Sequence, residues 1–442
     1  MRCLAWIVAV PALLAEDPVS FHKQIRPILV RSCVGCHQPA SMQAGLLLTS
    51  HEGFLKGGSK GAAVVPGDAG KSIVLGYLDG TKQPRMPFGG KPLPDDQIQL
   101  VKRWITEGAR DDSPAGATVT AARKQTVYRQ PPLVTALAFS PDGGLLAVSG
   151  HHETLLLNPD GALQARLPGL SMRINSLAFS PDGTLLAAVG GDPARMGELQ
   201  IWNVRDRKQL HSVVGSNDTF FGVSFSPDGK KIAFAGADKS IRIYESATGK
   251  EIRRADHHED WVFATIFGID GKRIVSVGRD RAAKLTDVET GRFIENVNLL
   301  KEPLTAITRH PRRDWVALGG TERIPYFYRM DRPRAMRIAD DSTLIRKFEK
   351  MDGPILALAI SSDGQWLAAG AEAGDVRIYN TETGDVAAHC KGHEGGIYAL
   401  QFHPDGKRLF TAGFDGLIRS YDTSGKLLNA FAPVPITRKE PK

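Results

Sequence analysis

The chain has 442 residues and a net charge of +8, from 56 basic and 48 acidic side chains. Basic residues are spread along the whole chain, so nothing in the charge indicates nucleic-acid binding.

The first fifteen residues, MRCLAWIVAVPALLA, are expected to form a signal peptide (1–15). One positive charge precedes an apolar run from Cys3 to Ala15, and a polar segment follows it. This pattern is typical of an export signal that is cleaved near Ala15. The run is too short to span a bilayer comfortably, so we expect contact with a membrane only if this segment is retained as an anchor. The mature chain is expected to be exported, to the periplasm or another extracytoplasmic compartment.

The stretch RSCVGCHQPA contains Cys33 and Cys36, two residues apart, with His37 directly after them. Three chemistries use such a run: half of a zinc site, a redox dithiol, or covalent attachment of haem. A structural zinc site needs four ligands, and no second pair at short spacing occurs. A thioredoxin-type dithiol opens a helix in a βαβ pattern, which is absent around these residues. The C-x-x-C-H spacing favours haem c, with both thiols bound to the vinyl groups and His37 as an axial ligand of the iron.

A second axial ligand is sought further along the chain. Met42 is only five residues from His37, and His51 is possible. Met86, in the stretch KQPRMPFGGKPLP, is favoured, because Pro84 and Pro87 stiffen its loop and the following glycines allow close approach to a flat cofactor. The predicted metal ligands are therefore His37 and Met86.

Two helices are predicted around this motif. Residues 21–33 place four apolar side chains on one helical face, with Pro27 either at a kink or in the first turn. Residues 95–108 begin at Asp95 or Asp96 as N-cap and end at Gly108. The apolar residues expected in the core are Phe21, Ile25, Ile28 and Leu29 in the first helix, and Ile98, Val101, Trp104 and Ile105 in the second.

Residues 19–110 resemble the cytochrome c-like domain of planctomycete and acidobacterial exported proteins. The matching stretches are IRPIL, CVGCH, AGLLLTSHEGFLKGGSKGAAVVPGDAGKSIVL, RMPFGGKPLPDDQI and WITEGA. The resemblance implies a small all-α haem domain at residues 16–112, with one haem c attached at Cys33 and Cys36 and ligated by His37 and Met86. The glycine-rich stretch AAVVPGDAGKS lacks the ending of a phosphate-binding loop, and we expect a surface loop there.

A small, polar linker is predicted at residues 113–124, and a repeat follows it. FSPDG or a degraded copy of it starts at residues 139, 179, 225, 267, 309, 360 and 402, at intervals of 40 to 51 residues. Such a period indicates the blades of a β-propeller. Each unit contains short apolar strands, as expected where neighbouring blades cover both faces of a sheet.

These units resemble WD repeats, most closely at residues 392–425. Seven units predict an all-β seven-bladed propeller at residues 125–433, followed by a C-terminal tail (434–442). Its scattered histidines, including His257, His258 and His393, are expected to form structural hydrogen bonds. Which terminus closes the ring is left open.

Two functions follow from this organisation. The favoured one is an electron carrier with one covalent haem, whose propeller docks a protein partner of unknown identity and whose haem serves a redox partner protein. The alternative is a haem-dependent oxidoreductase with the propeller forming part of the active site. No catalytic side chains are predicted for either, and the chain is more consistent with a carrier than with an enzyme.

Overall fold

The structure is a computed structural model and describes residues 17–34, 36–38, 41–112, 128–216, 218–299, 301–330 and 341–436. The chain divides into two compact units, one formed by residues 1–37 and 42–115 and the other by residues 38–41 and 116–442. The predicted signal peptide (1–15) and linker (113–124) lie outside the described residues. No helix in the described ranges is long and apolar enough to cross a membrane.

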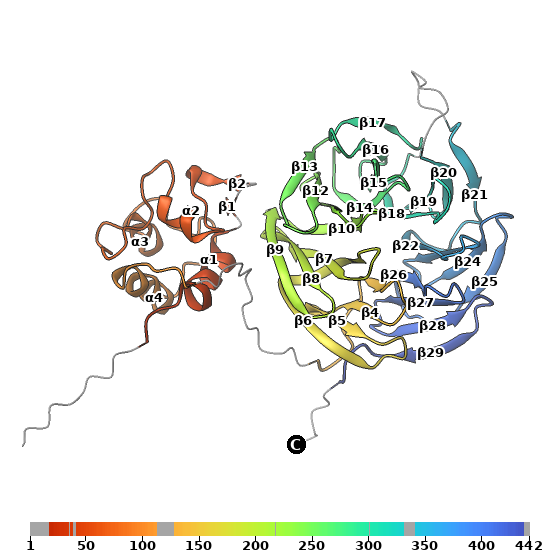
Figure 1. Cartoon of the computed structure of the whole chain (residues 1–442), viewed down its shortest axis with the longest axis horizontal. Helices are drawn as coiled ribbons and strands as arrows, with labels where there is room; N and C mark the ends of the chain where they lie inside the picture. The colour runs from red at the N-terminus through yellow and green to blue at the C-terminus, as the bar shows by residue number, and fades with distance from the viewer. Residues whose placement is uncertain are drawn as a thin grey trace, which may run out of the picture. The chain divides into compact units, whose positions relative to one another are not determined.

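The first unit is small and mainly helical (Figure 1). Its elements are the π-helical turn η1 (Phe21–Ile25), α1 (Arg26–Ser32), the short strands β1 (His37–Gln38) and β2 (Ser41–Met42), the 3-10 turn η2 (Gln43–Gly45), α2 (His51–Lys56), α3 (Ile73–Asp79) and α4 (Asp95–Thr106). All eight apolar residues expected in the core of this unit are buried. The ring of Trp104 stacks on Phe21 and Phe54, with centroids 5.3 and 5.7 Å apart.

Three local predictions in this unit are refined by the structure. Pro27 lies in the first turn of α1, where a missing N–H costs no hydrogen bond. Pro94 is the N-cap of α4, and Asp95 and Asp96 lie in its first turn, where their charge favours the helix dipole. The glycine-rich stretch AAVVPGDAGKS (62–72) is a loop, as predicted. It does not lie wholly on the surface, because Val64 within it is buried.

The second unit consists of antiparallel β-sheets arranged around a common centre (Figure 1). Among the described residues it contains one sheet of seven strands and five sheets of four. The seven-stranded sheet consists of β3 (Leu137–Phe139), β4 (Leu146–Ser149), β5 (His151–Leu157), β6 (Leu163–Phe179), β7 (Leu185–Asp192), β8 (Met196–Asn203) and β9 (Lys208–Ser216). The second sheet consists of β10 (Phe220–Phe225), β11 (Lys231–Gly236), β12 (Ile241–Glu245) and β13 (Glu251–Ala255), and the third of β14 (Val262–Phe267), β15 (Arg273–Gly278), β16 (Ala283–Asp287) and β17 (Phe293–Asn296).

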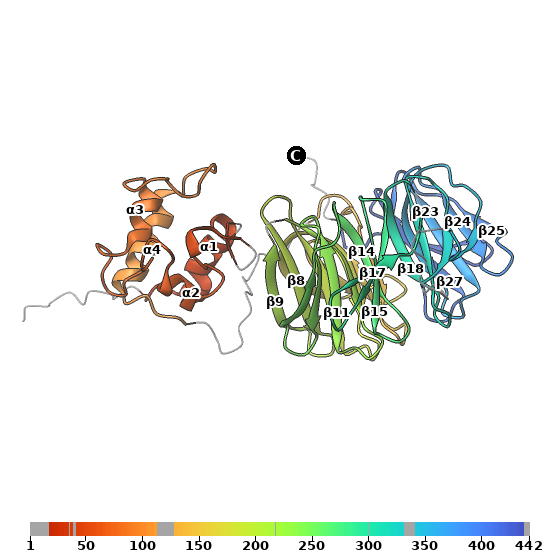
Figure 2. The ribbon, with the colours of Figure 1, turned by 90° about the horizontal axis from the view of Figure 1, so that it is seen from above.

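The chain then forms three more sheets of the same order. These are β18 (Leu304–Arg309), β19 (Trp315–Gly320), β20 (Tyr326–Arg329) and β21 (Leu344–Lys347); β22 (Ile355–Ile360), β23 (Trp366–Ala371), β24 (Val376–Asn380) and β25 (Val386–Cys390); and β26 (Ile397–Phe402), β27 (Arg408–Gly413), β28 (Ile418–Asp422) and β29 (Leu427–Phe431). In each sheet the first strand lies near the centre and the last lies at the rim (Figure 1). Figure 2 shows the unit from the side, where strands such as β8, β9 and β11 run between its two faces.

The sheets differ from the seven separate blades predicted from the repeat. The long strand β6 pairs with β5 through its first half and with β7 through its second half, so two repeats merge into one sheet. The physical reason is that the connection between these repeats, around residues 168–173, is itself extended and continues the ladder. These six sheets are of the WD-repeat type, and they do not by themselves establish a seven-bladed propeller.

Candidate functional site

The C-x-x-C-H motif lies in a tight turn at the end of α1. Cys33 is the C-cap of this helix, and the amide groups of Cys36 and His37 both donate to the Cys33 carbonyl, at 3.2 and 3.1 Å. Both thiols are free, the Cys33 thiol half-buried and the Cys36 thiol exposed. Burial, reinforced by the adjacent Cys36 thiol, raises the pKa of Cys33 to about 12. The turn thus holds two free thiols with two residues between them, and the Cys33 thiol stays protonated.

The His37 side chain is buried and is oriented by the backbone that follows it. Its Nδ1 lies 3.1 Å from the Gln43 carbonyl oxygen, and its own carbonyl accepts from the Leu48 amide at 2.8 Å. A carbonyl can only accept, so Nδ1 carries the proton and Nε2 keeps its lone pair in the neutral ring. Burial lowers the pKa of His37 and favours this neutral form. Metal-binding histidines are held in this way, with one nitrogen on a backbone carbonyl and the other toward the metal.

The donor set therefore fits a haem of the c type. Cys33 and Cys36 offer thiols to the vinyl groups, and His37 offers Nε2 to the iron. In the described ranges, these residues included, no three His, Cys, Asp or Glu side chains gather as the ligands of a bare metal ion would. The Gln43 carbonyl was not foreseen from the sequence, because any residue type supplies the same backbone oxygen.

Met86 lies in the loop between α3 and α4 and is half-buried. Its amide donates to the carbonyl of Tyr77 at 2.8 Å, which fastens the loop to the last turns of α3. This hydrogen bond fixes the Met86 backbone relative to α3. The role of Met86 as a second iron ligand, together with His37, stays a prediction.

The other histidine considered as a ligand, His51, is held by structural contacts. Its Nε2 lies 2.7 Å from the Ala109 carbonyl, and its ring makes edge contacts with Phe21 and Trp104. The imidazole is thus part of the core that joins α2 to α4. Met42 lies in β2, and its side chain is outside the described atoms.

Two histidines of the second unit form hydrogen-bond networks within their sheets. The Nδ1 of His258 lies 3.0 Å from Asp280 and its Nε2 lies 2.7 Å from Ser276. His393 repeats this arrangement with Asp415 at 3.2 Å and Thr411 at 2.6 Å. Each network ties the segment before a first strand to the turn between the second and third strands. These contacts agree with the structural role that was predicted for the histidines.

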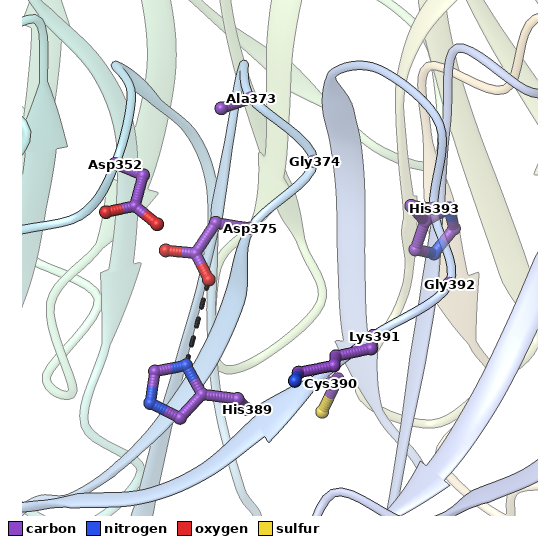
Figure 3. Close-up of a pocket in the computed structure, with 9 residues that line it drawn as sticks. All are labelled: Asp352, Ala373, Gly374, Asp375, His389, Cys390, Lys391, Gly392 and His393. Atoms are coloured by element: carbon purple, nitrogen blue, oxygen red, sulfur yellow. Dashed lines mark ion pairs between the residues drawn. The ribbon is translucent and has the colours of Figure 1, made fainter.

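A pocket of about 350 Å³ opens between the last two sheets (Figure 3). It is lined by Asp352, Ala373, Gly374, Asp375, His389, Cys390, Lys391, Gly392 and His393. Asp375 faces His389 (Figure 3), and one of its oxygens lies 4.0 Å from the His389 Nδ1. Its other oxygen lies 2.8 Å from the Nε of the buried Arg377 guanidinium. Arg377 also pairs with Glu349 and Asp352, at 2.8 and 3.1 Å. Asp352 and Asp375 at the pocket are thus both paired with the Arg377 guanidinium.

A helical unit with a thiol pair and an oriented histidine, followed by a unit of repeated antiparallel sheets, resembles a cytochrome c-like domain followed by WD repeats. Comparison with known families agrees. Residues 33–87 match the planctomycete cytochrome C family, and residues 123–157, 161–193, 207–245 and 384–422 match the WD domain, G-beta repeat. Residues 307–397 match the WD40 domain of anaphase-promoting complex subunit 4. The resemblance inferred from the sequence is confirmed: a cytochrome c-like domain is fused to WD repeats.

Several curated proteins are similar to parts of this chain, and two of them are WD repeat-containing proteins by name. Periodic tryptophan protein 2 of Saccharomyces cerevisiae is 31% identical over 28% of this chain and 13% of its own length. Eukaryotic translation initiation factor 3 subunit I of Culex quinquefasciatus is 28% identical over 61% of this chain and 60% of its own. Echinoderm microtubule-associated protein-like 2 of Homo sapiens is 26% identical over 51% and 33%, respectively. The matches thus span less than two thirds of each of these relatives.

Proposed function

We propose that the protein is an exported c-type cytochrome that carries one covalent haem, transfers electrons, and uses a closed seven-bladed propeller to dock a protein partner. The observation that carries the haem proposal is the buried, oriented ring of His37 next to two free thiols. Its Nδ1 faces the Gln43 carbonyl, and two free thiols precede it in the chain, Cys33 by four residues and Cys36 by one. Export is proposed from the N-terminal signal pattern, since haem c is attached outside the cytoplasm.

A haem bound at this motif supplies a one-electron iron couple. The chain's own part is to hold and shield it. Cys33 and Cys36 would anchor it, and His37 and Met86 would ligate its iron. A thioether is a soft, neutral ligand that favours ferrous iron, so this pair suits electron transfer at a higher potential than two histidines would. Two protein ligands also leave no open position for small molecules.

Closure of the propeller is supported by contacts between its first and last sheets. Strand β3 contacts β26, and the amide of Val134 donates to the Gly413 carbonyl at 3.3 Å. The ring of Phe139 packs on Phe410 with centroids 4.8 Å apart, inside a buried cluster that draws on both ends of the unit. If β6 serves as the outer strand of one blade and the inner strand of the next, the seven repeats form seven blades.

The turns after the first strands support the same closed ring. A Cβ on Gly183 would lie 3.3 Å from Pro141 of the preceding repeat, and one on Gly229 would lie 3.4 Å from Pro181. The last repeat meets the first in the same way, because a Cβ on Gly143 would lie 2.6 Å from His403. Each end of the chain completes its own blade, so we propose that packing, and not an exchanged strand, closes the ring.

Haem staining after denaturing electrophoresis tests the proposed function. Thioether bonds survive denaturation, so the wild-type band should stain for haem and the Cys33→Ala, Cys36→Ala double variant should not. A Cys390→Ala variant is the matched control and should stain like the wild type. Extraction of haem from the wild type by acid–acetone would refute covalent attachment. Ready binding of carbon monoxide by the reduced wild type would favour the oxidoreductase alternative.

A further inference from the structure

The loop between α3 and α4, residues 80–94, presents apolar side chains to solvent. Phe88 is 77% exposed, the highest value for a large hydrophobic side chain among the described residues. Pro84, Pro92 and Pro94 in the same loop are exposed too, and Met86 is half-buried. An exposed aromatic ring within a group of apolar residues is typical of a protein contact.

The same loop is rich in positive charge. Lys82, Arg85 and Lys91 are exposed, and residues 80–94 contain no acidic side chain. Two of these side chains lie along α3 and its C-terminal cap: a Cβ on Gly76 would lie 3.0 Å from Lys82, and one on Gly80 would lie 3.0 Å from Arg85. The cations are therefore placed around the loop by packing of their apolar stems.

Three acidic residues flank the loop, and each has a local role. The Asp79 carboxylate accepts from the amide and the hydroxyl of Thr81, at 2.9 and 2.7 Å. Asp95 and Asp96 lie in the first turn of α4, where the free amide groups of the helix attract negative charge. The flanking carboxylates therefore serve local contacts, and the positive charges of Lys82, Arg85 and Lys91 can attract an acidic partner.

We propose that residues 80–94 form a docking surface for an acidic protein, with Phe88 as its apolar anchor. An aromatic residue at the centre of a contact supplies binding energy, and a rim of cations selects and steers an anionic surface. The identity of this acidic protein as the redox partner rests on the proposed function, because Met86 would place the docking surface beside the haem.

Binding of a small acidic ferredoxin to the full chain tests this surface. The ferredoxin carries a fluorescent label, and its anisotropy is measured at low and high salt. A basic cytochrome of similar size and vesicles with anionic lipid are the comparison probes. The ferredoxin should bind, and binding should weaken steeply with salt because the contact is charged.

Two sets of variants separate charge from apolar contact. Lys82→Glu with Lys91→Glu should weaken ferredoxin binding at least about tenfold at low salt, because two attractive charges become repulsive. Phe88→Ser should weaken binding several-fold while leaving the salt dependence unchanged. The matched control is Lys56→Glu with Lys60→Glu, two exposed lysines of α2 and the turn after it, which should change binding by less than about twofold.

Equal loss of binding in the control pair would overturn the proposal, as would equal binding of the basic cytochrome. Binding to the anionic vesicles without binding to the ferredoxin would also overturn it, since the occupant would be a membrane. The anisotropy assay does not depend on redox activity. A chain that binds the ferredoxin but holds no covalent haem would therefore refute the proposed function and leave the docking surface standing.

Discussion

His51 and Met86 are the two side chains in the first unit that compete for the role of second axial ligand, and their contacts differ. His51 has its Nε2 on the Ala109 carbonyl and its ring between aromatic neighbours, whereas Met86 donates its backbone amide to the Tyr77 carbonyl. Met86→Ala should therefore open the sixth position of the iron, lower the reduction potential and allow carbon monoxide to bind. Visible spectroscopy of the reduced protein measures this change.

His51→Ala is the control at the residue scale. It should leave the ligation spectrum unchanged, although it should lower stability by about 1–3 kcal/mol through loss of a buried hydrogen bond and ring contacts. The opposite result, a changed spectrum in His51→Ala and an unchanged one in Met86→Ala, would show a bis-histidine site.

The residues that could be predicted from the sequence are those whose chemistry is in the side chain. Cys33, Cys36 and His37 carry a spacing that few other functions use, and Met86 stands out by its proline and glycine neighbours. The groups that orient His37 and Met86 are the carbonyls of Gln43 and Tyr77. No residue type signals a backbone carbonyl, so these could be found only from the folded chain.

At the scale of elements, the apolar pattern predicted the two helices around the motif, but it predicted the positions of their ends less accurately. The period of three to four residues marked Ile98, Val101 and Ile105 as buried, but Pro94 took the capping position assigned to an aspartate. The repeat likewise predicted the strands. It did not predict that β6 continues from one repeat into the next, because Pro168 and Gly169 indicate a turn where the chain in fact stays extended.

The hydrogen-bond network of His393 should make the last sheet sensitive to acid. Its side chain is 1% exposed, and burial together with the Arg419 cation lowers the pKa of His393 to about 4, from 6.5 when unfolded. The unfolded chain therefore binds an extra proton between pH 6.5 and 4, and the folded state should lose up to about 3 kcal/mol over that window as the pH falls. Above pH 6.5 this group should add no pH dependence.

Urea unfolding at several pH values measures this effect. His393→Gln should be less stable than the wild type at pH 7, because the hydrogen bonds to Thr411 and Asp415 change, and its stability should fall less between pH 6.5 and 4. His389→Gln, on the neighbouring strand and half exposed, is the control and should keep the wild-type profile. An unchanged slope in His393→Gln would contradict this account.

The contact between the first and last repeats can be tested at one glycine. Gly143 and Gly229 have φ values of 73° and 71° and occupy the same turn in their repeats, so an alanine is strained equally at both. At Gly143 the new Cβ would lie 2.6 Å from the His403 ring, whereas at Gly229 it would lie 3.4 Å from Pro181, an ordinary contact distance. Gly229→Ala should lower the free energy of unfolding by about 1 kcal/mol, and Gly143→Ala by about 2–4 kcal/mol. Equal losses would show that the first and last repeats are not in contact in solution.

At the scale of the whole molecule, the two units should fold independently, because each has its own core. Residues 125–436, expressed without the first unit, should give a monomeric β-protein by circular dichroism and gel filtration. The fragment ends at Ile436 because Val434 and Ile436 pack into the cluster that joins β3–β5 to the last sheet.

A fragment of residues 125–391, which lacks the last sheet, is the decisive comparison. Removal of the last sheet would expose two apolar faces. One is the face of β22–β25, where Ile378 and Ala388 pack on residues of β26 and β27. The other is the face of the first strands, where Phe139 packs on Phe410. Two exposed apolar faces cannot be offset by the remaining contacts of an open array, so this fragment should aggregate or remain unfolded. A stable, monomeric 125–391 fragment with the β-content of the longer one would show that the sheets fold as an open stack and that ring closure contributes little to stability.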